Sequence, residues 1–233
     1  MFGIFKKRDA EKKVVIFDFD GTIADTMMET VKIFNKIAEE SGYQKVTERE
    51  IKVLRGEDLE KVVRSMKIPI FVLPFLVWKA RSMMSRDIGR MKTTVKIRGA
   101  ILKIKKMGFK VGILTLNSKE NVALFLRKND LDVFDFVYAG GSIFGKHKMI
   151  KRALREIGMR PHEAVYVGDE VRDINAARRR RVSVISVTWG YNNEEALRRR
   201  GTDYIVRTPQ QLVSVVRGMK KARKQRGAAS PKK

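Results

Sequence analysis

Val14-Val15-Ile16-Phe17-Asp18-Phe19-Asp20-Gly21-Thr22 is the stretch of this chain that best indicates its fold. Residues 14–19 are predicted to form a strand, because a short run of large apolar and β-branched side chains is typical of strands buried on both faces of a parallel sheet. Asp18 and Asp20 stand two residues apart, so an extended backbone places both carboxylates on one side while Phe19 points into the core. The strand therefore delivers polar side chains at its carboxyl end.

Residues 25–89, which follow this strand, carry helical signals only. Apolar residues recur at three- and four-residue spacings over residues 26–40, and Thr47 to Glu50 have the spacing of a capping box that opens a second helix. Another helix is predicted from Asp58, and a longer, very apolar one precedes residue 89. We therefore predict a small all-helical cap domain, inserted after the first strand.

From residue 90 onward the pattern changes to strands that alternate with helices. Such alternation predicts an α/β fold with a Rossmann-like three-layer core, in which a parallel sheet lies between two layers of helices. The predicted strands are 109–114, 135–138, 164–167, 182–187 and 204–206, and the predicted helices are 95–108, 118–129, 146–157, 171–180, 194–199 and one from Pro209. The predicted core domain comprises residues 13–24 and 90–216, the cap domain residues 25–89, and a basic disordered tail residues 217–233.

The chain is strongly basic, since 51 Lys and Arg residues against 26 Asp and Glu residues give a formal net charge of +25. Such a charge favours contact with anions, whether nucleic acid, anionic lipid or phosphorylated metabolites, without choosing among them. Eight of the basic residues lie within residues 217–233, which contain no acidic residue. A weak contact with nucleic acid or another anionic surface through this tail is therefore one expectation.

The absence of cysteine and the scarcity of histidine limit the available chemistry. Without Cys there is no disulfide, thiolate metal site or cysteine nucleophile, and two His residues leave little for a zinc site. The longest uncharged apolar stretch, residues 68–78, is too short to span a bilayer, which takes about 20 residues. The amino terminus lacks the order of a signal peptide, so a cytoplasmic location is expected. A monomer or a homodimer is expected.

Polar side chains collect at the carboxyl ends of the predicted strands, which lie along one edge of a parallel sheet. They are Asp18 and Asp20 after the first strand, Thr115 and Asn117 after the second, Lys146 before the next helix, and Asp169, Glu170 and Asp173 after the fourth strand. Converging carboxylates repel one another unless a cation lies among them, and an all-oxygen ligand set suits Mg²⁺. The sequence therefore predicts a hard-metal site at this edge.

Two neighbouring carboxylates such as those of Asp18 and Asp20 can divide the work of phosphoryl transfer. One attacks phosphorus with the assistance of the metal, and the other, with a pKa raised by its neighbours, protonates the leaving oxygen and then activates water. Lys146 and the Thr115 hydroxyl can stabilise charge on the transferring phosphoryl group. This is the arrangement that phosphoryl transfer requires.

Four short motifs, taken in order, resemble those of the haloacid dehalogenase superfamily. They are Asp18-Phe19-Asp20-Gly21-Thr22, Thr115 after an apolar strand, Lys146, and Gly168-Asp169-Glu170-Val171-Arg172-Asp173. The resemblance covers about residues 13–215, and the helical insertion resembles the small cap of that superfamily. Within it the chain is most similar to phosphoglycolate phosphatase-like members, including the Trp189-Gly190-Tyr191 loop and the Asp203-Tyr204-Ile205-Val206 ending.

The resemblance implies a role for each matching residue. Asp18 would be the nucleophile that forms an aspartyl-phosphate, and Asp20 would be the general acid and base, supported by Thr22. Mg²⁺ would be held by the Asp18 carboxylate, the Asp20 main-chain carbonyl and Asp169, while Asp173 and Glu170 would stand behind these ligands. The implied substrate-binding residues are Thr22, Thr115, Asn117, Lys146 and Arg55, and the implied metal-binding residues are Asp18, Asp20, Asp169 and Asp173.

Two residues depart from the pattern of the family. Leu116 stands where a small polar residue is commoner, and Arg181 stands where relatives usually have Gly. A non-Gly residue in a left-handed helix cap costs roughly 1 kcal/mol, so the helix before Arg181 is expected to end differently. Neither position belongs to the predicted catalytic set.

The expected function is that of a Mg²⁺-dependent phosphatase acting on a small, phosphoglycolate-like phosphate monoester through an aspartyl-phosphate intermediate. One alternative is a phosphomutase of the same superfamily, which passes the phosphoryl group to a sugar phosphate rather than to water. Another is a nucleic-acid-associated factor that uses the basic tail. The residues that set the substrate lie in the cap, and their positions do not follow from spacing.

Overall fold

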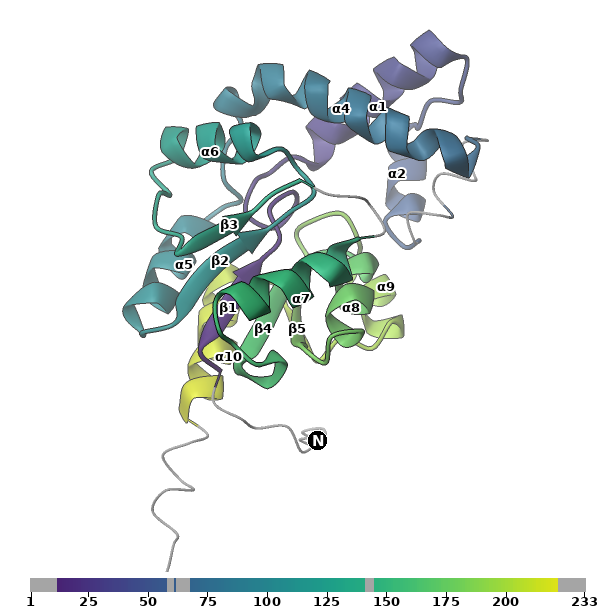
Figure 1. Cartoon of the computed structure of the whole chain (residues 1–233). Coiled ribbons are helices and arrows are strands. Elements are labelled where there is room, and N and C mark those ends of the chain that lie inside the picture. Colours follow the sequence, from purple (N-terminus) through teal and green to yellow (C-terminus); the bar gives the residue numbers. More distant parts are fainter. Residues whose placement is uncertain (1–11, 58–60, 62–67, 141–144, 222–233) are drawn as a thin grey trace, which may run out of the picture.

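The computed structural model describes residues 12–57, 61, 68–140 and 145–221. Within these residues, six parallel strands form one sheet in the order β3-β2-β1-β4-β5-β6 (Figure 1). The strands are β1 (Val14–Phe17), β2 (Lys110–Leu114), β3 (Phe136–Tyr138), β4 (Ala164–Gly168), β5 (Ser183–Val187) and β6 (Tyr204–Val206). The strand order reverses between β1 and β4, and open α/β sheets bind ligands in the crevice outside the carboxyl ends at such a point.

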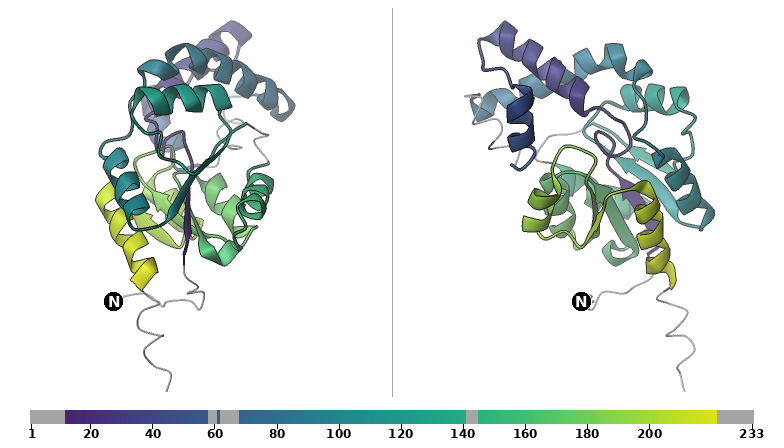
Figure 2. Two further views of the ribbon diagram at one scale, coloured as in Figure 1. Left: turned by 60° about the vertical axis from the view of Figure 1, so that its left-hand side comes forward. Right: turned by 180° about the vertical axis from the view of Figure 1, so that it is seen from behind.

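Helices cover both faces of the sheet (Figure 2). Val15 and Phe17 of β1 pack with apolar residues of α5, α6 and α10, whereas Val14 and Ile16 pack on the opposite face with α7, α8 and α9. These helices are α5 (Ile97–Lys106), α6 (Lys119–Lys128), α7 (Lys146–Glu156), α8 (Val171–Arg178), α9 (Glu194–Arg199) and α10 (Pro209–Lys221), and a 3₁₀ turn, η3 (Pro161–Glu163), precedes β4. The predicted three-layer α/β core is confirmed.

The helices between β1 and α5 lie beyond the carboxyl ends of the strands (Figure 1). They are α1 (Met27–Ser41), α2 (Glu48–Leu54), α4 (Leu73–Asp87) and the 3₁₀ turns η1 (Ile70–Val72) and η2 (Ile88–Arg90). Helix α1 packs against α4, and η2 packs against α6. Ile33 and Leu76 belong to the same apolar cluster as the sheet, so these helices share its core. A separate cap domain of residues 25–89 on a core of residues 13–24 and 90–216 stays a proposal.

The capping box predicted at the start of α2 is present, because the Glu50 carboxylate accepts from the Thr47 backbone N–H at 2.8 Å and the Glu50 N–H donates to the Thr47 hydroxyl at 3.3 Å.

Strand β1 ends at Phe17 rather than at residue 19, because the chain turns into a tight loop that Gly21 closes by donating to the Ala24 carbonyl.

The carboxyl-terminal part of the prediction needs one correction. The basic tail was expected from residue 217, but α10 continues through Lys221. Its buried residues Leu212, Val213 and Val216 pack on the sheet, and the helix runs on past this apolar stripe. Residues 222–233, and the start of the helix expected from Asp58, lie outside the described residues.

Arg181 adopts the backbone conformation in which Gly is usually found. Its φ is +58°, its N–H donates to the Arg178 carbonyl at 3.0 Å, and the next N–H, of Val182, donates to the Ala177 carbonyl at 3.0 Å. This pair of hydrogen bonds is the usual left-handed ending of an α-helix. The expectation that α8 ends differently is therefore wrong. The helix keeps the left-handed ending, and Arg181 bears the strain of a positive φ.

Arg181→Gly should raise the free energy of unfolding by about 0.5–1 kcal/mol. Glycine removes the contact between Cβ and the carbonyl oxygen that disfavours a positive φ, and this gain exceeds the extra freedom that glycine brings to the unfolded chain. Urea denaturation measures the change. Arg181→Ala is the matched control, since it removes the exposed side chain but keeps the Cβ; an equal gain in that variant would contradict the backbone explanation.

Candidate active site

Three buried carboxylates meet at the point where the strand order reverses. Asp18 follows β1, Asp169 follows its neighbour β4, and Asp173 lies in the first turn of α8. One oxygen from each lies within 4.8 Å of the others, and each residue is at most 2% exposed. The pairing of the strands sets this position, because Phe17 lies opposite Val167 and the Asp18 N–H donates to the Val167 carbonyl at 2.8 Å.

Two glycines allow the backbone to pass close to Asp169. Gly21 has a φ of +75°, and a Cβ at this position would collide with the Asp169 carboxylate and the Tyr191 ring. A Cβ on Gly190 would also collide with the Asp169 side chain. The Asp169 oxygens are instead fixed by two donors, the Thr22 hydroxyl at 2.7 Å and the Tyr191 backbone N–H at 2.7 Å.

Lys146 is the buried cation of this cluster. It is the first residue of α7, its side chain is 3% exposed, and its Nζ lies 2.8 Å from Asp18 Oδ2 and also pairs with Asp173 Oδ1. Burial lowers the pKa of Lys146, but the charges of Asp173 and Asp18 outweigh burial and hold that pKa well above its ordinary value. The ammonium therefore stays charged between the two carboxylates.

Asp20 lies apart from this group and has its own partner. The Asn117 side-chain amide donates to both Asp20 carboxylate oxygens at 3.2 Å. Burial raises the pKa of Asp20, and the hydrogen bonds from Asn117 oppose that rise because they favour the charged form. Asn117 is positioned by Thr115, whose buried hydroxyl accepts from the Asn117 backbone N–H at 3.0 Å.

The donor set fits a divalent cation that prefers oxygen ligands. Burial, opposed by Lys146, raises the pKa of Asp18 to about 7, and burial raises that of Asp169 well above its ordinary value. The carboxylates of the site are those of Asp18, Asp20, Asp169, Glu170 and Asp173, and its cations are Lys146 and Arg172. With every group ionised, these described residues carry an excess of three negative charges. Buried oxygen ligands with such an excess of negative charge suit Mg²⁺.

Comparison with known proteins agrees with this geometry. Residues 15–187 match the model of the family described as haloacid dehalogenase-like hydrolase, and this match spans both the carboxylate cluster and the helices above it. The chain belongs to the haloacid dehalogenase-like hydrolases.

Relatives of this haloacid dehalogenase-like hydrolase are named as phosphatases. The chain is 29% identical over 205 residues to a phosphoglycolate phosphatase of Synechococcus elongatus, covering 88% of this chain and 97% of the relative. It is 25% identical over 207 residues to the pyrophosphatase PpaX of Bacillus pumilus, covering 87% and 95%. A crystal structure titled as a predicted phosphatase from Clostridium acetobutylicum shares the fold with a TM-score of 0.77 and 20% identity, covering 90% and 100%. The prediction of a hydrolase of the phosphatase class is confirmed.

Two residues expected to contact substrate have other partners in the hydrolase. The Thr22 side chain is fully buried, and its hydroxyl donates to Asp169 rather than supporting Asp20. Arg55, which follows α2, donates from Nε to the Tyr191 carbonyl at 3.2 Å and from Nη2 to the Gly190 carbonyl at 2.9 Å. Both side chains therefore hold protein segments together. Lys146, Thr115 and Asn117 lie with Asp18 and Asp20, as expected.

Arg172 is a cation of the site that the sequence prediction missed. Its guanidinium pairs with Glu170, and its Nε–H is buried without a hydrogen-bond partner in the described part of the chain. Its charge lowers the pKa of both Asp18 and Asp20, against the effect of burial. Arg is so common in this chain that an arginine by itself does not indicate a site residue. The position of Arg172 between Glu170 and Asp173 does indicate one.

The loop of residues 188–193 joins the site to the helices above it, and it rises from the sheet toward them (Figure 2). Asn192 Nδ2 donates to the Arg55 and Glu57 carbonyls at 3.0 and 2.9 Å, and the Tyr191 hydroxyl shares a 2.7 Å hydrogen bond with Thr30 of α1. Because the Tyr191 N–H donates to Asp169, this loop contacts α1, the segment after α2 and the carboxylate cluster at once.

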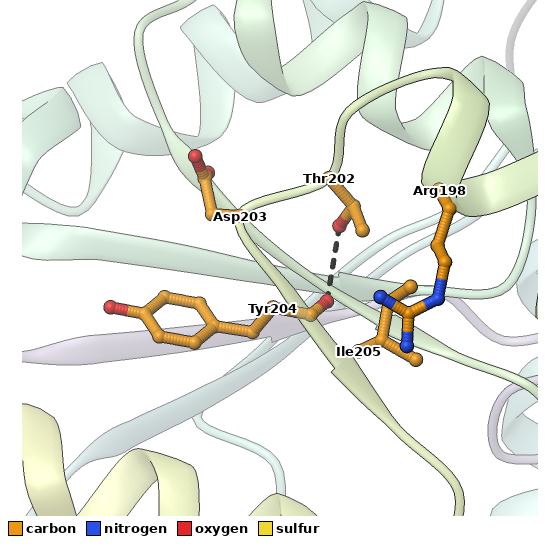
Figure 3. A pocket seen from close by; sticks show the side chains of 5 residues that line it. All are labelled: Arg198, Thr202, Asp203, Tyr204 and Ile205. Carbon is orange, nitrogen blue, oxygen red and sulfur yellow. Dashed lines mark hydrogen bonds between the residues drawn. The ribbon is translucent and has the colours of Figure 1, made fainter. Parts of the chain in front are cut away.

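Two cavities of the described structure bear on the site. One, of about 170 Å³, lies among α1, α2 and residues 188–193 and reaches Glu170. The other, of about 330 Å³, is an open hollow beside the edge strand β6, lined by Arg198, Thr202, Asp203, Tyr204 and Ile205 (Figure 3). In that hollow the Thr202 hydroxyl donates to the Tyr204 carbonyl, and the Asp203 carboxylate accepts from the Val184 N–H. Only the first cavity adjoins the carboxylate cluster.

None of the helices that the structure describes is both long and apolar enough to cross a membrane.

Proposed function

We propose that this hydrolase is a Mg²⁺-dependent phosphatase that hydrolyses a small phosphate monoester through an aspartyl-phosphate on Asp18. The observation that carries this proposal is the buried cluster of Asp18, Asp169, Asp173 and Lys146 where the strand order reverses. The names of its relatives, phosphoglycolate phosphatase and pyrophosphatase, support phosphate chemistry.

In the first half of the reaction, a carboxylate oxygen of Asp18 attacks phosphorus and the bond from phosphorus to the ester oxygen breaks. Asp20, with a pKa raised by burial, supplies the proton that the leaving oxygen takes. Lys146, 2.8 Å from Asp18, and the Thr115 hydroxyl would compensate the charge on the phosphoryl oxygens. Asp18, Asp169 and the Asp20 main-chain carbonyl would hold Mg²⁺, with Asp173 behind them, and the bound ion would further compensate that charge.

In the second half, water attacks the phosphorus of the aspartyl-phosphate and gives its proton to Asp20. The bond between phosphorus and the Asp18 oxygen breaks, which releases phosphate and restores both carboxyl groups to their starting states. Asn117 holds the Asp20 carboxylate through two hydrogen bonds, and so keeps it in place between its roles as acid and as base.

Release of inorganic phosphate from p-nitrophenyl phosphate, with and without Mg²⁺, tests the proposal. Turnover should require Mg²⁺ and stop on addition of EDTA, and Mg²⁺ should raise the melting temperature of the protein because it binds only the folded site. Asp169→Asn should abolish that rise in melting temperature. A phosphomutase would instead release little phosphate to water and need an acceptor sugar phosphate. Equal turnover in EDTA would end the metal part of the proposal.

Asn117→Ala should shift the alkaline limb of the pH profile of kcat to higher pH. The Asn117 amide favours the charged form of Asp20, so removing it raises further a pKa that burial already raises. The protonated acid that the first half needs then persists to higher pH. Asn121→Ala is the control, since its amide donates to Asn117 Oδ1 at 3.0 Å rather than to Asp20. A limb that stays in place or moves to lower pH in Asn117→Ala would contradict this role.

A further inference from the structure

The 170 Å³ cavity beside the carboxylate cluster has an apolar wall. Helix α1 contributes one side and α2 with the segment before it contributes the other; the apolar residues are Met27, Val31, Phe34, Val46, Ile51 and Leu54. Apolar side chains around a cavity favour an apolar occupant, because burying such a group removes its surface from water.

Three polar side chains of the same wall already have hydrogen-bond partners within the protein. Asn35 donates to and accepts from the Val46 backbone at 2.8 and 2.7 Å, and Thr30 shares its hydrogen bond with Tyr191. Arg55, the cation among the described lining residues, directs Nε and Nη2 to main-chain carbonyls of residues 188–191. The described part of the wall therefore offers no ready cation to an anionic group.

The charged side chain that lines the cavity next to the carboxylate cluster is an acid rather than a base. This residue is Glu170, which follows Asp169 immediately in the chain and pairs with Arg172. A substrate carboxylate in this cavity would face the Glu170 carboxylate and lose its water, which is costly for an ion without a partner. An uncharged group meets neither obstacle.

The cavity adjoins the carboxylate cluster through Tyr191 and Glu170. Tyr191 lines it and donates its N–H to Asp169 Oδ2 at 2.7 Å, and the charge of Asp20, after burial, contributes to a raised pKa of the Tyr191 hydroxyl. The cavity and the cluster thus share the walls formed by Glu170 and Tyr191.

We propose that this cavity holds the organic part of the phosphate monoester, and that this part is uncharged and apolar, of about the size of a benzene ring. A cavity of roughly 150 Å³ lined by Leu, Ile and Phe is large enough for benzene. This assignment rests on the proposed phosphatase function and narrows its substrate class away from carboxylate-bearing esters such as phosphoglycolate.

Three phosphate esters test the assignment: benzyl phosphate, ethyl phosphate and phosphoglycolate. All three release a primary alcohol, so the leaving oxygens are chemically similar. The kcat/KM of benzyl phosphate should exceed that of phosphoglycolate by about 100-fold, with ethyl phosphate between them, since a pocket discriminates by roughly 10–200-fold for a group of one methylene. Hydrolysis in which phosphoglycolate is the preferred ester overturns the assignment while leaving the phosphatase proposal in place.

Two variants locate the effect in the cavity. Val31→Trp fills it and should reduce the ratio of kcat/KM for benzyl phosphate to that for ethyl phosphate by at least about 10-fold. Val53→Trp is the matched control, because Val53 lies on α2 but is 67% exposed and does not line the cavity, so its ratio should match the wild type. Circular dichroism checks that each variant folds. An unchanged ratio in folded Val31→Trp counts against the assignment.

Binding of two non-hydrolysable phosphonates to the wild-type protein separates the two proposals. Calorimetry should show that benzylphosphonate binds more tightly than phosphonoacetate, which carries a carboxylate. Tight binding of benzylphosphonate without hydrolysis of any ester contradicts the phosphatase proposal but supports the apolar cavity. Tighter binding of phosphonoacetate contradicts the apolar cavity, whether or not esters are hydrolysed.

Discussion

Asp18→Asn should reduce the turnover of p-nitrophenyl phosphate by about 10⁴-fold or more, because loss of a nucleophile removes the covalent route entirely. The amide has nearly the shape of the carboxylate but carries no charge with which to attack phosphorus. The substitution also removes one of the buried carboxylates whose pKa burial raises, so the folded protein should not lose stability beyond the loss of one contact with Lys146. Steady-state kinetics and urea denaturation measure the two effects.

Asp25→Asn is the control for this variant, since Asp25 lies in the same loop but is exposed. Its turnover should equal that of the wild type. Mass spectrometry of wild-type protein quenched in acid during turnover should find a phosphoryl group on Asp18, and none in Asp18→Asn. Undiminished phosphate release by Asp18→Asn would end the proposed mechanism, because that mechanism assigns the attack on phosphorus to Asp18 alone.

Lys146→Met should lower the free energy of unfolding at neutral pH by about 3–5 kcal/mol. The ammonium is the shared partner of Asp18 and Asp173, and removing one partner from a buried ion group leaves uncompensated charges in the interior. Methionine fills much of the same volume, so the loss reports charge rather than packing. Urea denaturation in EDTA measures it.

Two further samples separate this explanation from a general disturbance of α7. Lys148→Met changes an exposed lysine two residues further along the helix and should alter stability by less than about 0.5 kcal/mol. Lys146→Met combined with Asp173→Asn should recover part of the loss, since one of the unpaired charges is then absent. A loss below about 1 kcal/mol in Lys146→Met would show that the buried charges do not depend on the ammonium.

The sequence predicts the sheet and the meeting of the carboxylates for a simple reason. A short apolar strand followed by a polar residue fixes which end of the strand carries chemistry, and parallel strands align those ends. Asp18, Asp169 and Lys146 therefore lie together although more than 125 residues separate Asp18 from the other two. The helix ending at Gly108, with a φ of +85°, was predictable for the same kind of local reason.

The hydrogen-bond and ion-pair partners of individual side chains could not be predicted from the sequence. Thr22 lies two residues from Asp20, yet its hydroxyl reaches Asp169 from another strand, because Gly21 turns the chain between them. Arg55 and Arg172 are both arginines near the site, and only the packing of residues 188–193 and Glu170 decides where each guanidinium points. Spacing along the chain carries no information on such contacts.

The contacts of residues 188–193 change what counts as an exchangeable module in this family. A replacement of residues 25–89 by the corresponding helices of a relative would remove Arg55, Glu57 and Thr30, the partners of this loop, and leave its carbonyls and the Tyr191 hydroxyl without them. The same loop holds Asp169, so the mismatch would reach the carboxylate cluster. The unit suited to recombination is therefore discontinuous, and a chimera should carry the inserted helices and residues 188–193 from one parent.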